Sequence, residues 1–294
     1  MMSDVGLKYG PVIFEGVSPN AAFMTRVKKF ILTARTKYQE VQILELYEYG
    51  RALVLDGYIQ STEYDEFIYH ESLVHPITVT HPHPKKALII GGGEGATLRE
   101  ILKHSSIDEA VMVDIDGELI EFAKKYLDFM HQGSFNDPRS KLLIEDGYKY
   151  VKDIAPRKYF DVVVLDLTDP YGPEISRKLY SKEFYAMVKS VMKDDGIMVT
   201  QAGNSFFYPR TYARVLEDIK ANFSIVREYW VWIPSFGYAC NFIAASDALD
   251  PALMSEDEVN SRLKSRNVET KFYDGALHVS FFKGKVLLGR VPEE

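Results

Sequence analysis

The chain from residue 87 onward alternates short, mainly apolar runs with segments of helical character, and this rhythm constrains the fold most. The apolar runs are residues 87–90, 110–116, 141–146, 160–167 and 196–202, and helices are expected at Ala96–His104, Glu118–Met130 and Phe184–Met192. Apolar strands joined by helices form parallel sheets that are covered on both faces. The sequence therefore predicts an α/β fold with a Rossmann-like, doubly wound sheet and right-handed crossovers.

The N-terminal part of the chain follows a different pattern. Residues 29–55 alternate and carry many β-forming side chains, and Gly50 and the pair Asp56-Gly57 supply turns. A further strand is expected at Tyr58–Glu63. These features predict a small N-terminal antiparallel β-domain built of hairpins.

A connecting helix is expected at Phe67–Val79, which is mostly apolar at helical spacing. Two residues that precede prolines in the segment 81–86 are disfavoured in helical conformation, so a boundary is expected there. The predicted division is an N-terminal β-domain with its connecting helix, residues 1–80, and a catalytic domain, residues 81–294. Further strands and a helix near residues 257–266 are expected at the C-terminal end.

Acidic side chains follow the predicted strands at the edge of the sheet where the strands' carboxyl ends meet. In open α/β sheets this edge carries the ligand site. The residues concerned are Glu94, Asp114, Asp146, Asp166 and Asp169. The chain as a whole has 35 basic and 42 acidic residues, a formal net charge of -7. This charge would attract a cationic ligand and repel nucleic acid, so no nucleic-acid partner is expected.

A glycine-rich turn follows the first strand of the predicted sheet. It reads Gly91-Gly92-Gly93-Glu94-Gly95 and opens a helix. Glycines let the backbone turn tightly and approach a ligand closely. Asp114 ends the next strand, where an acidic side chain typically binds ribose hydroxyls. Together they predict an adenosine site, although a plain strand-to-helix turn is the alternative. The turn has no basic residue and no G-K-[ST] sequence, so a triphosphate is not expected.

Glu94 narrows the choice of adenosine ligand. S-adenosylmethionine carries a carboxylate on its tail, which a glutamate in the turn would repel. Decarboxylated S-adenosylmethionine keeps the ammonium group and lacks the carboxylate, so Glu94 favours it as the donor. The alternative is an S-adenosylmethionine-dependent methyltransferase on the same fold. A separate alternative for Glu94 itself is that its side chain points to solvent or caps the following helix.

Two carboxylates, Asp166 and Asp169, follow the fourth strand in a segment that ends in Pro173. Asp-Pro and Gly-Pro pairs are typical of turns, but two carboxylates this close can also converge on a cation. An alkylamine is protonated near neutral pH and has no free lone pair. One carboxylate can bind the amine and accept its proton, while the other holds a second ammonium. The pattern predicts alkyl transfer from a sulfonium donor to an amine.

Other features limit the class of protein. Cys240 is the single cysteine, so no intrachain disulfide can form, which fits a reducing compartment. No signal sequence and no apolar run long enough to cross a membrane is found, so a cytoplasmic protein without a membrane partner is expected. No metal site is expected, because standard ligand spacing completes neither of two histidine pairs, His70 with His75 and His81 with His83.

Five segments together resemble one known family. They read LDGYIQSTEYDEFIYHE, LIIGGGEG, VMVDID, EDG and DLTDPYGP, in this order and spacing. They are similar to the polyamine aminopropyltransferases, the spermidine and spermine synthase family, and the resemblance covers about residues 27–273. It implies a homodimer or homotetramer that moves an aminopropyl group from decarboxylated S-adenosylmethionine to spermidine or putrescine and releases methylthioadenosine. It also implies that no metal and no bound cofactor take part.

The resemblance also implies roles for individual residues. Asp166 matches the proton acceptor, and Tyr69 matches a tyrosine that orients the attacking amine. The methylthioadenosine portion of the donor is expected at Gln39, Asp114, Asp146, Gly147 and Pro173. The aminopropyl and amine groups are expected at His70, Glu94, Asp169, Gln60 and Phe236.

Three positions depart from the usual pattern of the family. Glu94 stands in place of aspartate, Asp114 in place of glutamate, and Phe236 in place of the tyrosine of members that use diamines. Together with the segment 201–203, Gln-Ala-Gly, they resemble the thermospermine synthase branch. The acceptor therefore stays open among putrescine, agmatine and spermidine. A non-catalytic polyamine sensor is another class of protein, but the presence of Asp166 favours an enzyme.

Overall fold

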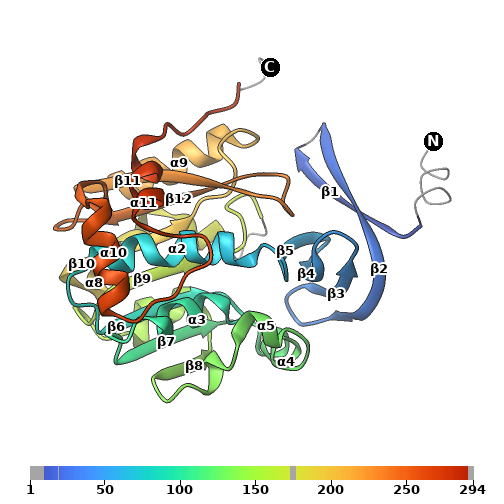
Figure 1. Ribbon diagram of the computed structural model, residues 1–294, viewed down its shortest axis with the longest axis horizontal. Coiled ribbons are helices and arrows are strands. Elements are labelled where there is room, and N and C mark those ends of the chain that lie inside the picture. The colour runs from blue at the N-terminus through green and yellow to red at the C-terminus, as the bar shows by residue number, and fades with distance from the viewer. Residues whose placement is uncertain (1–9, 19, 173–176, 291–294) are drawn as a thin grey trace.

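Five antiparallel strands form an N-terminal sheet in this computed structural model, which describes residues 10–18, 20–172 and 177–290 (Figure 1). The strands are hydrogen-bonded in sequence order. They are β1 (Val12–Ser18), β2 (Ala21–Arg35), β3 (Glu40–Leu46), β4 (Gly50–Leu55) and β5 (Tyr58–Thr62). The predicted small antiparallel β-domain is therefore confirmed.

β1 lies outside the strands that the sequence predicts. It contains Glu15 and Gly16, residue types that are depleted in strands, so its β-forming pattern is interrupted. The strand forms because its backbone pairs with β2, from Val12 opposite Arg26 to Ser18 opposite Ala21.

A seven-stranded sheet follows, in the order β11-β12-β10-β9-β6-β7-β8. The strands from β10 to β8 run parallel to their neighbours, as predicted. β12 is antiparallel to both of its neighbours, β10 and β11, so the complete sheet is mixed. The strands are β6 (Lys86–Gly91), β7 (Glu109–Asp114), β8 (Ser140–Ile144), β9 (Phe160–Asp166), β10 (Met192–Gln201), β11 (Ile225–Ile233) and β12 (Tyr238–Ser246).

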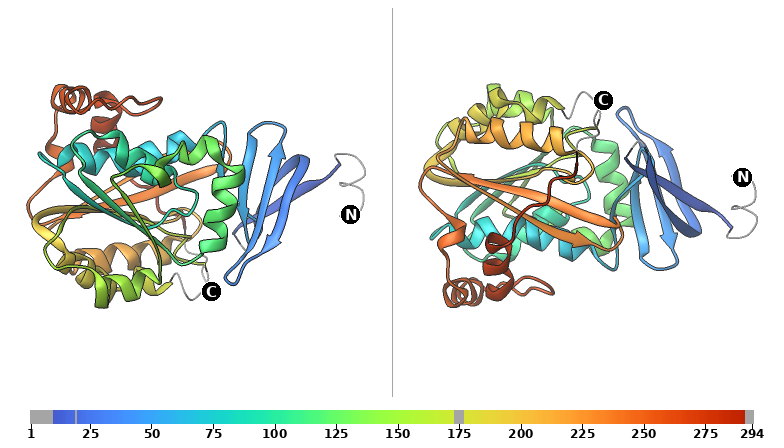
Figure 2. Two further views of the ribbon diagram at one scale, coloured as in Figure 1. Left: turned by 90° about the horizontal axis from the view of Figure 1, so that it is seen from below. Right: turned by 90° about the horizontal axis from the view of Figure 1, so that it is seen from above.

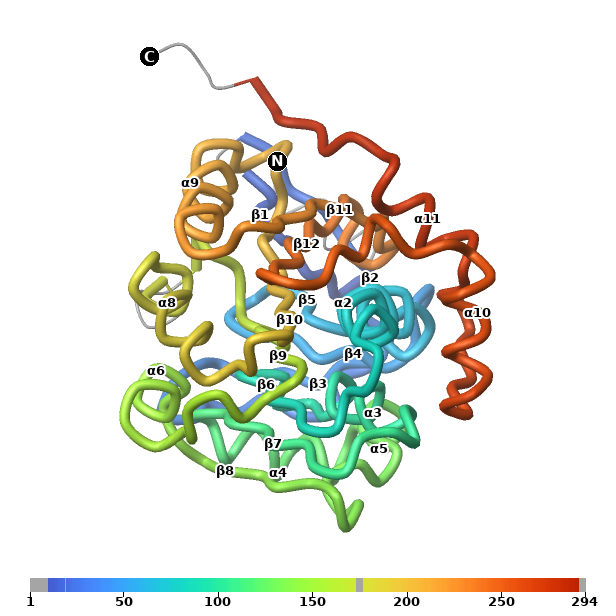
Figure 3. The backbone as a smooth tube through the Cα atoms, turned by 90° about the vertical axis from the view of Figure 1, so that its left-hand side faces the viewer, coloured from blue at the N-terminus to red at the C-terminus, as the bar shows by residue number. Residues whose placement is uncertain are grey.

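Helices cover both faces of this sheet, so the predicted doubly wound α/β fold is confirmed (Figure 3). Ala87 and Ile89 of β6 belong to the core on one face, and Leu88 and Ile90 belong to the core on the other. The first face carries α2 (Glu66–Thr80), α3 (Ala96–Lys103), α10 (Glu256–Ser265) and α11 (Gly275–Lys283). The second carries α6 (Gly147–Lys149), a π-helical turn (Tyr150–Ile154), α8 (Lys182–Val191) and α9 (Pro209–Lys220). Short 3-10 turns lie at Ser134–Asn136, Lys178–Tyr180 and Pro251–Leu253.

α2 is the connecting helix that the sequence predicts, and it is buried along almost its whole length. Its buried residues include apolar side chains and also polar ones, among them Glu66 and His70. It packs against α3 and against β10 and β11 of the large sheet. The division of the chain between residues 80 and 81 stays a prediction. No helix within the described ranges has both the length and the apolar character needed to cross a membrane.

The segment expected as one helix from Glu118 to Met130 forms two, α4 (Gly117–Tyr126) and α5 (Asp128–His131). The break falls at Leu127, whose φ of -123° and ψ of 41° are not helical. Leu127 is buried against apolar residues of β3 and β4, so tertiary packing sets the break. The same contacts join the N-terminal sheet to the rest of the chain, beyond the ends of the large sheet's strands (Figure 2).

Candidate active site

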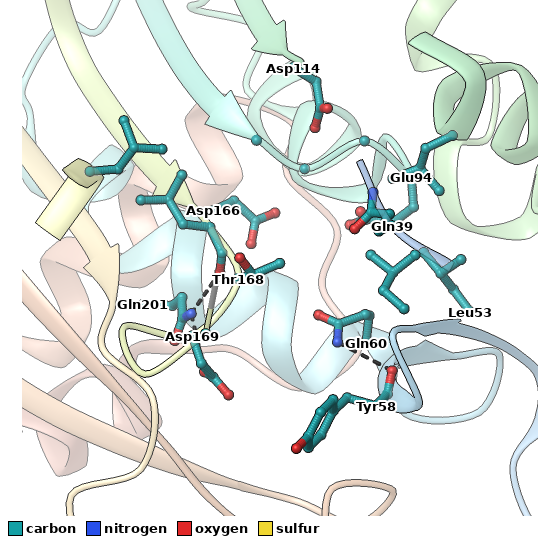
Figure 4. A pocket seen from close by; sticks show the side chains of 18 of the residues that line it. Gln39, Leu53, Tyr58, Gln60, Glu94, Asp114, Asp166, Thr168, Asp169 and Gln201 are labelled. Atoms are coloured by element: carbon teal, nitrogen blue, oxygen red, sulfur yellow. Dashed lines mark hydrogen bonds between the residues drawn. The ribbon is translucent and has the colours of Figure 1, made fainter. Parts of the chain in front are cut away.

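A cavity of about 460 Å³ lies between the N-terminal sheet and the carboxyl edge of the parallel strands (Figure 4). Every predicted site residue that the structure describes lines it: Gln39, Gln60, Tyr69, His70, Glu94, Asp114, Asp146, Gly147, Asp166, Asp169 and Phe236. The remaining predicted residue, Pro173, lies outside the described residues. Folding therefore brings together side chains that are far apart in the sequence.

The glycine-rich turn after β6 brings the ends of β6 and β9 into contact. Gly91 has a φ of 85°, and a Cβ atom there would lie 2.1 Å from the carbonyl oxygen of Asp166. The backbone N–H of Gly92 donates to the same oxygen over 3.1 Å. Any side chain at residue 91 would push the two strand ends apart, so glycine is what lets Asp166 stand beside the turn.

Asp166 is held by two hydroxyl groups. Tyr69 Oη donates to Oδ1 over 2.8 Å, and Thr97 Oγ1 donates to Oδ2 over 2.6 Å. Burial and the nearby charge of Glu94 raise the pKa of Asp166 to about 6. A carboxyl group with a pKa close to neutrality is suited to take up and release a proton.

His70 lies between two glutamates. Its Nδ1 is 2.9 Å from Glu66 Oε2, and its Nε2 is 2.9 Å from Glu94 Oε1. Burial disfavours a charge on the ring, but the hydrogen bonds to Glu66 and Glu94 raise the pKa of His70 to about 10. Arg99 in turn donates to both carboxylate oxygens of Glu66, over 3.1 and 2.8 Å. The Glu94 side chain is only 12% exposed, so the alternative in which it points to solvent is wrong.

Asp169 lies three residues beyond Asp166 and faces the same cavity (Figure 4). Gln201 Nε2 lies 3.3 Å from Asp169 Oδ1 and donates to the carbonyl oxygen of Leu167 over 2.6 Å. Burial raises the pKa of Asp169. β10, which carries Gln201, therefore fixes the loop after β9 and with it the spacing of the two carboxylates.

Gln39 and Asp114 lie at the other end of the cavity (Figure 4). Both are held by Asp116: its Oδ2 accepts a hydrogen bond from Gln39 Nε2 over 2.8 Å, and its backbone N–H donates to Asp114 Oδ1 over 2.8 Å. Burial raises the pKa of Asp114 to about 7. The loop after β7 thus joins the N-terminal sheet to the large sheet at the site.

Asp146 and Gly147 form the floor of the cavity next to β6. Asp146 Oδ1 accepts a hydrogen bond from the backbone N–H of Tyr148 over 2.8 Å and caps α6. A Cβ atom at Gly147 would lie 2.4 Å from Ile90 Cγ2, so only glycine fits there. Because Gly147 has no side chain, the turn at residues 146 and 147 exposes its backbone to the cavity there.

Gln60 and Phe236 belong to the part of the wall near Asp169 and Tyr69. Gln60 Nε2 donates to the carbonyl oxygen of Tyr58 over 3.2 Å. The ring of Phe236 lies 6.2 Å from the ring of Tyr69 and 5.7 Å from the ring of Tyr238. This part of the wall is aromatic, which suits the methylene groups and the cationic nitrogens of an alkylamine.

Among the described residues, two groups of side chains have atoms close enough to share a metal ion. His70, Glu94 and Asp166 place theirs within 4.8 Å of one another, but both ring nitrogens of His70 face glutamate oxygens and have no lone pair to offer. In the second group, formed by His81, Asp161 and Asp195, Lys193 already binds Asp161. The first group therefore suits an ammonium ion better than a metal.

Several residues that hold the site are not indicated by the sequence. Thr97 and Arg99 both lie on α3; Thr97 contacts Asp166, and Arg99 contacts Glu66, only in the folded chain. Asp116 has no feature in the sequence that distinguishes it from the other acidic residues. The i, i+4 spacing of Glu66 and His70 was an available signal, because residues at that spacing are neighbours on a helix.

The charge of the cavity wall is strongly negative. Its carboxylates are Asp56, Glu94, Asp114, Asp146, Asp166 and Asp169, and its described residues include no lysine or arginine. The one cation among the described lining residues, His70, is balanced by two glutamates. The site is therefore suited to a ligand, or a pair of ligands, with several positive charges.

Comparisons with known proteins agree with this chemistry. The spermine/spermidine synthase domain matches residues 66–255, and the spermidine synthase tetramerisation domain matches residues 12–63. A crystal structure of spermidine synthase in complex with the transition-state analogue AdoDATO superposes with a TM-score of 0.87 at 32% identity, covering 94% of this chain and 92% of the other. The spermidine synthase of Thermotoga maritima superposes with a TM-score of 0.83 at 32% identity, covering 93% and 90%.

Two further relatives have a higher sequence identity to this chain. The polyamine aminopropyltransferase of Pyrobaculum aerophilum is 51% identical over 280 residues, which cover 95% of this chain and 96% of the relative. Polyamine aminopropyltransferase 1 of Hyperthermus butylicus is 52% identical over 253 residues, which cover 86% and 87%. The chain therefore belongs to the spermine/spermidine synthase family of enzymes, as its motifs predict.

Proposed function

We propose that this protein transfers an aminopropyl group from decarboxylated S-adenosylmethionine to a polyamine acceptor and releases methylthioadenosine. The observation that carries the proposal is Asp166, held by Tyr69 and Thr97 in a cavity lined by carboxylates and, among its described residues, by no lysine or arginine. Such a cavity attracts a cationic amine and a sulfonium donor and offers a base to the amine.

Asp166 is the proton acceptor in this reaction. The amine arrives as an ammonium ion, since its pKa is about 10. Asp166, which is ionised above about pH 6, takes one proton and leaves the nitrogen with a lone pair. The lone pair attacks the aminopropyl carbon attached to sulfur, so that a C–N bond forms while the C–S bond breaks. The electron pair of the broken bond stays on sulfur, and the neutral thioether leaves without a general acid.

The neighbours of Asp166 position the amine. Tyr69 fixes the carboxylate and orients the attacking nitrogen, and Asp169 binds a second ammonium of the acceptor. Holding both reactants in line can lower the activation free energy by about 7 kcal/mol or more in favourable cases. His70 supports the site by orienting Glu94.

Glu94 binds the ammonium at the end of the donor's aminopropyl group. The methylthioadenosine portion lies along Gln39, Asp114, Asp146 and Gly147, and Pro173 would complete the adenine pocket. S-adenosylmethionine would place a carboxylate against Glu94, which is why methyl transfer is the weaker alternative.

The acceptor is a triamine such as spermidine, used at least as well as putrescine. Phe236 lacks the hydroxyl that would bind the far ammonium of a short diamine, and its ring can pack on methylene groups next to Gln60. A site without a matching polar group discriminates little in favour of the shorter ligand. The product is then a tetraamine such as thermospermine or spermine; assignment to the thermospermine branch stays a prediction.

The proposal includes no metal and no bound cofactor, because the sulfonium donor is a co-substrate that supplies the reactive carbon. The match of residues 12–63 to a tetramerisation domain supports a homodimer or homotetramer. The single, buried Cys240 and the net charge of -7 support a cytoplasmic protein without nucleic-acid or membrane partners.

Product analysis tests the function. The protein is incubated in the presence of a metal chelator with decarboxylated S-adenosylmethionine and, separately, putrescine, agmatine or spermidine, and the products are identified by mass spectrometry. Methylthioadenosine and an amine longer by one aminopropyl group are expected. Methylated products from S-adenosylmethionine would instead support a methyltransferase, and amine binding without turnover would support a sensor.

A further inference from the structure

Thr97 is a fully buried residue in the first turn of α3, and it does not line the active-site cavity. Its Oγ1 donates to Asp166 Oδ2 over 2.6 Å. A buried threonine of α2 behaves differently: Thr78 Oγ1 donates over 2.7 Å to the carbonyl oxygen of Val74, four residues back in its own helix. The hydroxyl of Thr97 is instead committed to the carboxylate that takes the proton in the proposed reaction.

The two oxygens of Asp166 have different surroundings. The side chain points into the cavity (Figure 4), and Oδ1 accepts from Tyr69, which lines the cavity. Oδ2 lies against the glycine-rich turn, since a Cβ atom at Gly92 would be 3.0 Å from it and 3.6 Å from Thr97 Cβ. Tyr69 therefore binds Asp166 within the cavity, and Thr97 binds it from the side of α3.

A hydroxyl group that donates to a carboxylate stabilises its ionised form, because the charged oxygen is the stronger acceptor. Burial and the charge of Glu94 raise the pKa of Asp166. The groups that lower this pKa are His70, Thr97 and Tyr69. His70 and Tyr69 line the cavity, where a ligand contacts them. The hydrogen bond from Thr97 lies outside the cavity wall, so it persists while the substrates are bound.

Other ionisable groups also face Asp166. The charge of Asp166 acts on groups of three further elements: Asp114 on β7, Tyr180 in the 3-10 turn and Cys240 on β12. Asp169 faces the same cavity from the loop after β9. None of these side chains can carry a positive charge, so none of them favours the ionised form of Asp166.

We propose that Thr97 is a positioning residue that holds Asp166 as the anion and so extends the reaction toward lower pH. In this arrangement Oδ2 stays bound to Thr97, and Oδ1, next to Tyr69, receives the proton of the attacking ammonium. An N–H bond of the ammonium breaks, an O–H bond forms on Oδ1, and the electron pair stays on nitrogen. The inference rests on the proposed aminopropyl transfer and adds a residue that acts on the reaction without contacting either substrate.

Thr97→Val tests the role, because it keeps the shape of the side chain and removes the hydroxyl. The value of kcat/KM for the amine, at saturating donor, is divided by the wild-type value at each pH, so that ionisation of the amine cancels. This ratio is expected to be lowered about tenfold or more near pH 5, the effect of losing a hydrogen bond to a charged group, and to return to within about threefold of wild type near pH 9.

Two further variants separate the hydroxyl from packing. Thr97→Ser restores the hydroxyl, and its ratio should stay close to one at every pH. Thr78→Val, the matched control, removes a buried hydroxyl that binds a backbone carbonyl, and its ratio should not depend on pH. A serine variant that behaves like the valine variant, or a ratio in Thr97→Val that is equally low at every pH, would leave Thr97 with only a structural role.

Titration of Asp166 by carbon-13 NMR gives a readout that does not depend on turnover. The carboxyl resonance is assigned by its absence in Asp166→Asn, and in Thr97→Val it should titrate about one pH unit or more above the wild-type midpoint. An unchanged midpoint would overturn the assignment of Thr97. Wild-type protein that releases no methylthioadenosine with any amine would refute the proposed function, whereas the titration would still measure the effect of Thr97 on Asp166.

Discussion

His70 and Glu94 are joined by a hydrogen bond of 2.9 Å between Nε2 and Oε1, which links α2 to the glycine-rich turn after β6. On its other side His70 is bound to Glu66, which Arg99 holds with two hydrogen bonds. Because both ring nitrogens face acceptors, the ring is a cation, and one oxygen of Glu94 is occupied by it. The orientation of Glu94 toward a ligand is therefore set by His70, which is itself held by two residues that do not line the cavity, Glu66 and Arg99.

Glu66→Gln tests this positioning. Loss of the carboxylate beside Nδ1 should lower the pKa of His70 from about 10 toward its ordinary value, and the KM for the donor should rise about tenfold as Glu94 loses its support. NMR titration of the His70 ring and steady-state kinetics measure the two effects. Glu217→Gln, at an exposed position on α9, is the control. A His70 that still titrates near pH 10 would contradict the role of Glu66.

Glu94→Gln should reduce the preference for the decarboxylated donor. The variant loses the charge that attracts the terminal ammonium and repels the carboxylate of S-adenosylmethionine, so the ratio of the two Kd values should narrow about tenfold or more. Competition binding with both donors gives that ratio. An unchanged preference would refute the charge argument.

Asp166→Asn keeps the shape of the side chain and removes the proton acceptor. We expect kcat to fall about a hundredfold or more, as for other losses of a general base. Binding of the donor, measured by calorimetry, shows whether the variant is folded. A near-normal kcat would mean that another group takes the proton.

The rate should increase as the pH rises through about 6. The pKa of Asp166 lies above its ordinary value, so the carboxyl group is protonated below about pH 6 and cannot accept a proton there. At higher pH the carboxylate is available and the free amine becomes more common, so both effects act in the same direction. A profile of kcat/KM against pH measures this, and a maximum near pH 5 would contradict the mechanism.

Gly91→Ala should destabilise the fold strongly. The added Cβ would lie 2.1 Å from the carbonyl oxygen of Asp166, and the φ of 85° is unfavourable for alanine. We expect the free energy of unfolding to fall by about 3 kcal/mol or more in chemical denaturation. Gly133→Ala is the matched control, because Gly133 has a φ of 84° and open space around its Cβ position. Similar losses in both variants would show that the contact with Asp166 is unimportant.

The sequence by itself determined the alternation of strands and helices and the acidic edge of the sheet. Both depend on local patterns: apolar runs must be covered on both faces, and residues that follow parallel strands meet at one edge. These rules place four acidic residues around one cavity: Glu94, Asp114, Asp166 and Asp169. The motifs around them also sufficed to predict the family.

Only the tertiary structure decided which groups support these residues. The predicted helix is interrupted at Leu127 because this residue packs against β3 and β4. β1 forms because its backbone is hydrogen-bonded to β2. Thr97 on Asp166 and the hydrogen bond from Ile59 to Glu15 join segments that are distant in the chain. No local pattern encodes such contacts, because hydrogen bonds and burial between distant segments exist only after the sheets and helices have packed together.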